Sequence, residues 1–268
     1  MKTYVAVALA IALLPSSPSR SAVSEPTVRE IMQRVDERDD GERRILELNL
    51  SLIDKSGQAR ERSVRVFSRD HGRETQQIIF FLSPADVKDT GLLTYDYPGA
   101  ERDDDQWLYL PALRKTKRLA SSDQSGAFLG SDFSYADLTR RELDDYDYRL
   151  IGSEDVRGEP TWKVEALPRS ADEVKRTGYA KSVLFVRKDN YFVVRAVHWV
   201  KEGEKLKYQD ATKLERISGI WVATEINMTT KKGRETVHKT VLKVKSVDFE
   251  RQLADDIFTI RQLEKGPL

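Results

Sequence analysis

Short stretches of alternating apolar and polar residues recur along most of the chain, and this pattern constrains the fold more than any other feature. In residues 46–52, four leucines alternate with polar residues, which is typical of a strand that buries one face. Turn residues at 55–57, 189–190 and 232–233 separate such stretches and favour tight hairpins. The pattern predicts roughly a dozen strands, and therefore a mainly β fold with an up-and-down antiparallel sheet.

Two of the expected elements carry further information. Residues 78–82 are apolar on both faces, so we expect this strand to lie centrally in the sheet. Val28, Ile31, Met32 and Val35 have the spacing of one helical face, which predicts an amphipathic helix within residues 26–38. The candidate strands are residues 46–52, 64–66, 73–83, 92–97, 107–110, 113–119, 148–155, 162–167, 180–187, 192–201, 205–217, 221–230 and 235–249.

The N-terminal residues 1–22 have the order of a secretory signal peptide. Lys2 precedes an apolar run at residues 4–14, which is too short to span a bilayer, and small residues follow at 16–22. A membrane anchor or an N-terminal core helix is the alternative interpretation. Cleavage near Ala22 would lower Lys plus Arg from 45 to 43 against 44 acidic residues, giving an exported, periplasmic protein with a nearly neutral charge.

The remaining residues, 23–268, are expected to form a single domain. The chain has 268 residues, and all-β proteins of about 200 to 250 residues commonly form one domain. Hydrophobic residues make up 39% and charged residues 33% of the chain, as expected when many strands have one face in water. Neither a linker rich in Pro, Gly or Ser nor an internal repeat divides the sequence.

The composition gives no support for catalysis or for a cofactor. A formal charge of +1 argues against nucleic acid as a partner, and the absence of cysteine excludes disulfides and a lipobox. His71, His198 and His238 do not have a metal-ligand spacing, and each is interpreted as an ordinary surface or strand residue. The acidic cluster at 103–105 could bind a cation, although a solvated loop explains it more simply.

Residues 106–138 are the most distinctive stretch of the sequence. An aromatic strand that contains Trp107 and Tyr109 ends at Pro111, and a strongly basic strand follows at 113–119. Residues 120–134 are rich in Ser, Asp and Gly, yet they include Phe128, Leu129 and Phe133. This is too apolar for a solvated loop, so we expect these side chains to rest on another part of the molecule.

The run WLYLPALRKTKRLASSDQSGAFLGSDFSYADL, at residues 107–138, resembles the signature of the periplasmic outer-membrane lipoprotein-sorting protein family, the LolA-like group. The resemblance implies a strongly curved antiparallel sheet of the LolA/LolB type, an incomplete β-barrel. It also implies short helices that cover the concave apolar face and close over a cavity for acyl chains.

The function that this resemblance implies is that of a non-enzymatic carrier. Such a protein binds acyl chains of lipids or lipoproteins in the periplasm for transport towards the outer membrane. The resemblance also implies an inner-membrane exporter of the RND type as a partner. The alternative is a periplasmic sensor or adaptor, in which lipid or lipoprotein occupancy regulates a protein partner.

Two sets of candidate site residues follow. Residues 125–138, which include Gly126 and Gly130, are expected to form a lid over the cavity, although core packing is the alternative role for the apolar set. The second set could contact an anionic membrane or an acidic partner surface, or could be a solvated strand face. The apolar cavity and lid set is Leu46, Leu48, Leu50, Leu52, Trp107, Tyr109, Phe128, Leu129, Phe133 and Tyr135, and the basic set is Arg114, Lys115, Lys117 and Arg118.

Overall fold

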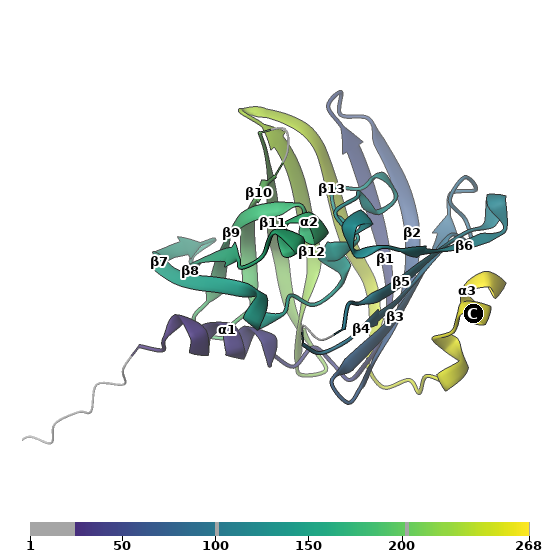
Figure 1. The fold of residues 1–268 in the computed structure, drawn as a ribbon, viewed down its shortest axis with the longest axis horizontal. Coiled ribbons are helices and arrows are strands. Elements are labelled where there is room, and N and C mark those ends of the chain that lie inside the picture. The colour runs from purple at the N-terminus through teal and green to yellow at the C-terminus, as the bar shows by residue number, and fades with distance from the viewer. Residues whose placement is uncertain (1–24, 100–101, 202–203, 268) are drawn as a thin grey trace, which may run out of the picture.

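The structure, a computed structural model, describes residues 25–99, 102–201 and 204–267. The expected signal peptide at residues 1–22 lies outside the described residues. A 13-stranded antiparallel sheet dominates the fold and is not closed into a barrel, as predicted (Figure 1). Its strands are β1 (Arg43–Asp54), β2 (Ala59–His71), β3 (Glu74–Ser83), β4 (Gly91–Asp96), β5 (Asp105–Leu110), β6 (Lys115–Leu119), β7 (Tyr146–Val156), β8 (Glu159–Pro168), β9 (Tyr179–Arg187), β10 (Val193–Val200), β11 (Lys205–Ile217), β12 (Ile220–Lys232) and β13 (Glu235–Asp248).

The strand order differs from a simple up-and-down sheet. The order is β6-β5-β4-β3-β2-β1-β13-β12-β11-β10-β9-β8-β7, so two meanders are joined where β1 pairs with β13. As a result β6 and β7, which are consecutive in the chain, form the two opposite edges of the sheet. The connection between them, residues 120–145, crosses the inside of the curved sheet (Figure 1).

The first meander is apolar on both faces because both of its faces are covered. On β3, Ile79 and Phe81 belong to the cluster on the concave side, whereas Ile78 and Phe80 belong to a different cluster on the convex side. β3 pairs with β2 and β4, which confirms the central position predicted from its two apolar faces.

Two helices lie on the concave side of the second meander. α1 (Val28–Asp36) begins at Thr27, whose hydroxyl and backbone form a reciprocal capping box with Glu30, and its Ile31 and Met32 pack with apolar residues of β8, β9 and β10. α2 (Ala171–Thr177), which the sequence patterns did not predict, begins at Ser170 and ends at Gly178 with φ 76°. Glycine reaches this left-handed conformation without the steric cost that a Cβ would impose.

The convex side of the first meander is covered by the C-terminal segment, with α3 (Ile260–Lys265) at its end (Figure 1). Phe258 and Leu263 are buried against this face. α3 therefore covers the convex face, unlike the short helices expected over the concave one. Gly91 on β4 allows this contact, because a Cβ there would lie 2.6 Å from the Leu263 side chain. No described helix is both long enough and apolar enough to cross a membrane.

One part of the predicted ligand set is corrected by this arrangement. Trp107 and Tyr109 pack in the convex cluster with the C-terminal segment, so they do not line the concave face. Their neighbour Leu108 belongs to the concave cluster, because successive side chains of a strand point to opposite faces. The alternation separated the two faces of β5 correctly, but Trp107 and Tyr109 were predicted on the concave face and lie on the convex one.

Candidate ligand-binding cavity and lid

The lid, residues 125–138, is a compact loop with its own backbone hydrogen bonds. Phe128 N donates to Phe133 O at 2.7 Å, and Tyr135 N donates to Gly126 O at 3.1 Å. The chain reverses through Leu129 (φ 45°) and Gly130 (φ 79°), both in the left-handed region that favours glycine. These internal contacts allow the loop to keep its shape as a unit.

The lid packs against the leucine face of β1. Phe128 is 4% exposed, and its ring centre lies 5.6 Å from that of Phe81 and 5.6 Å from that of Tyr135. The structure thus joins the predicted lid residues and the predicted leucines in one apolar cluster on the concave side. This cluster contains Leu46, Leu48, Leu50, Leu52, Phe128, Leu129, Phe133 and Tyr135.

Asp132 fixes the lid to β12 and β13, and we call this group of contacts the Asp132 anchor. Its carboxylate is 4% exposed and accepts hydrogen bonds from Thr230 Oγ1 at 2.5 Å and Thr240 Oγ1 at 2.7 Å. His238 Nδ1 lies 2.6 Å from the same carboxylate, and it must carry the hydrogen if the carboxylate is ionised, because that group only accepts. Asp132 N donates to Thr240 Oγ1 at 2.9 Å.

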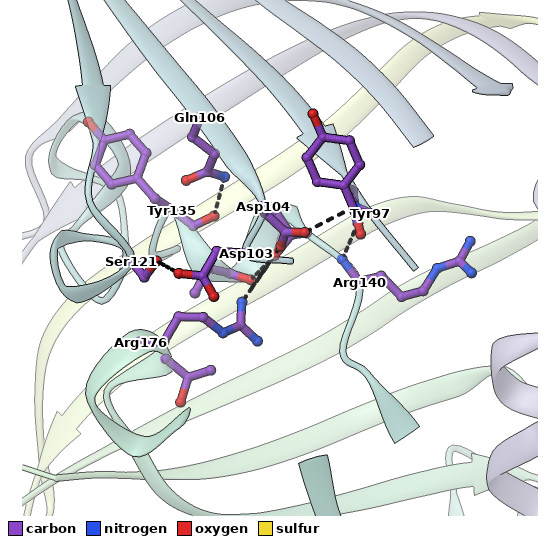
Figure 2. A network of polar contacts seen from close by, with 12 residues as sticks. Tyr97, Asp103, Asp104, Gln106, Ser121, Tyr135, Arg140 and Arg176 are labelled. Carbon is purple, nitrogen blue, oxygen red and sulfur yellow. Dashed lines mark hydrogen bonds and ion pairs between the residues drawn. The ribbon is translucent and has the colours of Figure 1, made fainter. Parts of the chain in front are cut away.

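Two further hydrogen bonds hold the lid from the first meander. Arg62 Nη1 on β2 donates to Leu129 O at 2.5 Å, and Gln106 Nε2 on β5 donates to Tyr135 O at 3.1 Å (Figure 2). The lid is therefore tied to both halves of the sheet by a few polar contacts around an apolar centre.

Beside the lid, the concave side holds a cavity of about 710 Å³, within the range of small-molecule sites. It lies between α1, residues 136–143 and the facing strands. None of the ten predicted ligand residues lines it, since the lid itself covers the leucine face. Its apolar wall includes Met32, Val35, Leu138, Leu184 and Ala196.

The polar wall of the cavity was missed by the sequence patterns. His198 is a strand residue on β10, one of the two roles expected for it, and it is 4% exposed with its Nδ1 2.8 Å from Ser182 Oγ. Burial and the neighbouring Arg141 lower the pKa of His198 to about 3, so the ring is neutral at physiological pH. Its ring stacks on Tyr179, whose hydroxyl donates to Asp137 at the end of the lid at 2.8 Å.

The acidic cluster at 103–105 joins the β4–β5 connection to α2 and to Ser121 in the segment after β6 (Figure 2). Asp104 accepts from Tyr97 N at 3.2 Å and lies 3.9 Å from Arg176 of α2, while Asp103 accepts from Ser121 Oγ at 2.6 Å. Among the described residues, no group of three or more histidine and acidic side chains is arranged to hold a metal ion.

Asp96 lies beside this network at the end of β4 and accepts a hydrogen bond from Arg140 N at 2.5 Å. Burial, together with the charge of Asp104, raises the pKa of Asp96 to about 7. Arg140 is on the segment that leaves the lid for β7, so a titrating group lies at the exit of the lid.

The basic strand is divided between the two faces of β6. Lys117 Nζ lies 3.3 Å from Asp123, and Arg118 pairs with Asp105, so the acidic cluster offsets part of the charge. Arg114 and Lys115 are exposed at the tip of the β5–β6 hairpin, next to Leu113, whose exposed fraction is 62%. The tip combines apolar and basic side chains at one edge of the sheet.

Comparison with known proteins places this geometry among related folds. A family model described as "Uncharacterized protein" matches residues 73–265. No curated protein matches the sequence.

Three solved structures are similar over 88% of this chain. A DUF1329 family protein from Desulfovibrio piger ATCC 29098 has 30% identity and a TM-score of 0.79, with 97% of that chain covered. A putative outer membrane lipoprotein-sorting protein domain from Vibrio parahaemolyticus has 28% identity, a TM-score of 0.79 and 97% of that chain covered. The LolA superfamily protein NE2245 from Nitrosomonas europaea shares the fold, with 21% identity, a TM-score of 0.66 and 99% of that chain covered.

Proposed function

Because the chain belongs to the DUF1329 family and has the LolA-like fold, as does a lipoprotein-sorting protein domain that is similar over most of its length, we propose that it is a non-enzymatic periplasmic carrier. In this proposal, residues 23–268 act as one carrier domain after the signal peptide is removed. The carrier shelters acyl chains of a lipid or lipoprotein and passes them towards the outer membrane. The observation that carries the proposal is the aromatic loop of residues 125–138 packed on the leucine face, next to a cavity of about 710 Å³.

The closed lid occupies the surface on which an acyl chain would lie. Phe128, Phe133 and Tyr135 cover the leucines of β1, so these leucines are kept from water when no ligand is bound. When a ligand enters, the chain takes over this contact and the rings close on the chain. Burial stabilises the complex by about 0.8 kcal/mol per CH₂ group, so one acyl chain contributes roughly 8 to 10 kcal/mol before ordering costs.

Carriage of this kind needs no bond to be broken, which is why we propose a protein without catalytic activity. The polar groups around the lid have structural partners that hold the closed state. Asp132 is bound by Thr230, Thr240 and His238, and Tyr179 is bound to Asp137. Opening and closing of the lid is then the working step of the carrier.

The proposed partners are an exporter that supplies the lipid and an anionic surface that the carrier contacts. An inner-membrane exporter of the RND type as the source of the lipid is supported by the family resemblance. The hairpin tip with Leu113, Arg114 and Lys115 supports contact with an anionic membrane or an acidic partner surface, since it combines an exposed apolar side chain with two cations.

The proposal is tested by titrating the mature protein with a fluorescent fatty acid, alongside urea unfolding. Wild type should bind the probe, and Phe128→Ala/Phe133→Ala should bind it more than tenfold more weakly. Burial of each ring is worth about 1.5 to 3 kcal/mol. If half of this free energy is spent on the ligand, its loss from both rings is enough to weaken binding tenfold. The matched control is Phe258→Ala, which removes a buried ring from the convex face and should change stability without changing affinity.

Two results would contradict the proposal. If wild type binds neither the probe nor any copurifying lipid detectable by native mass spectrometry, the protein is not an acyl-chain carrier. If the double variant loses stability while its probe affinity equals that of wild type, the rings are ordinary core residues and the lid has no role in binding.

A further inference from the structure

Arg141 differs from the other arginines in the cavity wall. Arg44, Arg140 and Arg176 each lie within 4.0 Å of an acidic side chain, and Arg38 donates to two backbone carbonyl groups. Arg141 forms no ion pair with any described residue. Its Nη2 donates to Ser182 Oγ at 3.5 Å, and its Nη1 is buried without a hydrogen-bond partner in the described part of the chain.

Tyr148 on β7 offers a second donor in the same wall. Its hydroxyl is buried and has no hydrogen-bond partner among the described residues. Tyr146 connects the two groups, because its ring stacks on Tyr148 at 6.1 Å between ring centres and lies 4.6 Å from the Arg141 guanidinium. Burial raises the pKa of Tyr148 to about 12, so the hydroxyl keeps its hydrogen at physiological pH and can donate it.

Two acidic groups in the surroundings of Arg141, Asp137 and Glu173, already have other partners. Asp137 accepts from Tyr179 Oη at 2.8 Å and from Ser134 N at 2.7 Å. Glu173 accepts from Tyr146 Oη and forms an ion pair with Arg176 at 2.7 Å. Arg141 Nη1 and the Tyr148 hydroxyl therefore belong to the wall of a cavity in which neither donor has an acceptor from the described chain. Buried donors of this kind are costly unless a partner satisfies them.

We propose that Arg141 and Tyr148 form a subsite for the anionic headgroup of an amphiphile whose acyl chain starts in the same cavity and continues beneath the lid. The inference rests on the proposed carrier function and names its ligand class: a chain that ends in a carboxylate or a phosphate. Guanidinium groups bind such oxygens with charge-assisted hydrogen bonds, and the Tyr148 hydroxyl supplies another donor. Met32, Val35, Leu184 and Ala196 provide apolar wall for the first part of the chain.

The test measures displacement of a neutral apolar dye, N-phenyl-1-naphthylamine, from the mature protein. Palmitate, methyl palmitate and palmitoyl lysophosphatidate are the competitors, so that chain length is constant while the headgroup changes. Wild type should prefer palmitate to its methyl ester about ten- to hundredfold, as expected for charge-assisted hydrogen bonds. A stronger effect of lysophosphatidate than of palmitate would identify the natural headgroup as a phosphate, and the reverse order as a carboxylate.

Arg141→Gln should lose this preference while its affinity for the dye and for the methyl ester stays at the wild-type value. Arg141→Lys should keep part of the preference. Arg149→Gln is the matched control, because it removes one positive charge from exposed β7 outside the cavity and should leave all affinities unchanged. If Arg141→Gln does not fold, Tyr148→Phe tests the same subsite by removing one hydroxyl. Its affinity for palmitate should then fall severalfold, and its affinity for the methyl ester should not change.

The results separate this inference from the carrier function. Binding of dye and ester by a wild type that does not prefer the anionic competitors would overturn the headgroup subsite and leave the carrier intact. Retention of the full preference in Arg141→Gln or Tyr148→Phe would also overturn it. If wild type binds neither the dye nor any competitor, the carrier function and the subsite are both wrong.

Discussion

Replacement of Asp132 by Asn should open the lid without unfolding the sheet. The Asp132 carboxylate accepts from Thr230, Thr240 and His238, and these contacts join the lid to β12 and β13. Asparagine keeps the shape of the side chain but replaces one acceptor oxygen by an NH₂ donor. At least one of the contacts is therefore lost, and the others change from charge-assisted to neutral hydrogen bonds.

The size of the effect follows from those contacts. Hydrogen bonds to charged groups contribute about 1.5 to 3 kcal/mol and neutral ones about 0.5 to 1.5 kcal/mol. We therefore expect the free energy of lid opening to fall by about 2 to 4 kcal/mol, which raises the open population roughly 30-fold to nearly 1000-fold. In the proposed carrier a ligand binds the open state, so its apparent affinity should rise with that population until the open state predominates.

Amide hydrogen exchange followed by NMR measures this opening directly. Asp132 N donates to Thr240 Oγ1 across the contact between lid and sheet, so exchange at residue 132 reports detachment of the lid. Phe128 N donates to Phe133 O inside the lid and should stay protected if the loop moves as a unit. Asp103→Asn, which changes an exposed carboxylate bonded to Ser121, is the matched control and should leave residue 132 unaffected.

The reasoning would be refuted by a uniform response. If exchange at residue 132 and at the amides of β1 and β13 accelerates by the same factor in Asp132→Asn, the lid opens only when the whole sheet unfolds. An unchanged rate at residue 132 would show that the anchor does not hold the lid.

Three further predictions concern pH, packing and the membrane. Asp96 holds an extra proton in the folded state between about pH 4 and its pKa of about 7, so its contribution to stability falls as pH rises through this window, by at most about 1.4 kcal/mol per pH unit. The His198 pKa of about 3 has the opposite effect, because stability is lost as pH falls below about 6.5. On acidification to pH 4, urea unfolding should therefore show that the free energy of unfolding falls relative to wild type in Asp96→Asn and rises relative to wild type in His198→Asn. Equal dependence on pH in both variants would contradict this. Gly91→Ala should lower the free energy of unfolding by about 1 to 3 kcal/mol through the clash with Leu263, and a double variant with Leu263→Ala should lose less than the sum of the single losses; strict additivity would count against the clash. Arg114→Gln/Lys115→Gln should weaken binding to vesicles that contain anionic lipid by up to about 1 kcal/mol per charge at low salt, and wild-type binding that ignores lipid charge and ionic strength would remove the membrane contact.

The sequence by itself determined most of the strands and the burial of the aromatic rings in residues 125–138. Alternation of apolar and polar residues is a local property, so the strands and the central position of β3 could be predicted without knowledge of their partners. Phe128 and Phe133 were identified because two rings in a loop rich in Ser and Gly have to be covered, and the structure covers them. The curved open sheet followed from the resemblance carried by residues 107–138.

Only the tertiary structure decided which faces and which polar groups meet. Trp107 and Tyr109 alternate correctly but face the C-terminal segment, because both faces of the first meander are covered and alternation does not distinguish them. The pairing of β1 with β13 sends β6 and β7 to opposite edges, a long-range choice that hairpin signals do not contain. Asp132 and His238 are brought together across 106 positions of the chain, and Arg141 Nη1 is buried without a hydrogen-bond partner among the described residues. Whether a charged side chain is paired is decided by its neighbours in space, and those neighbours are set by strand order and curvature.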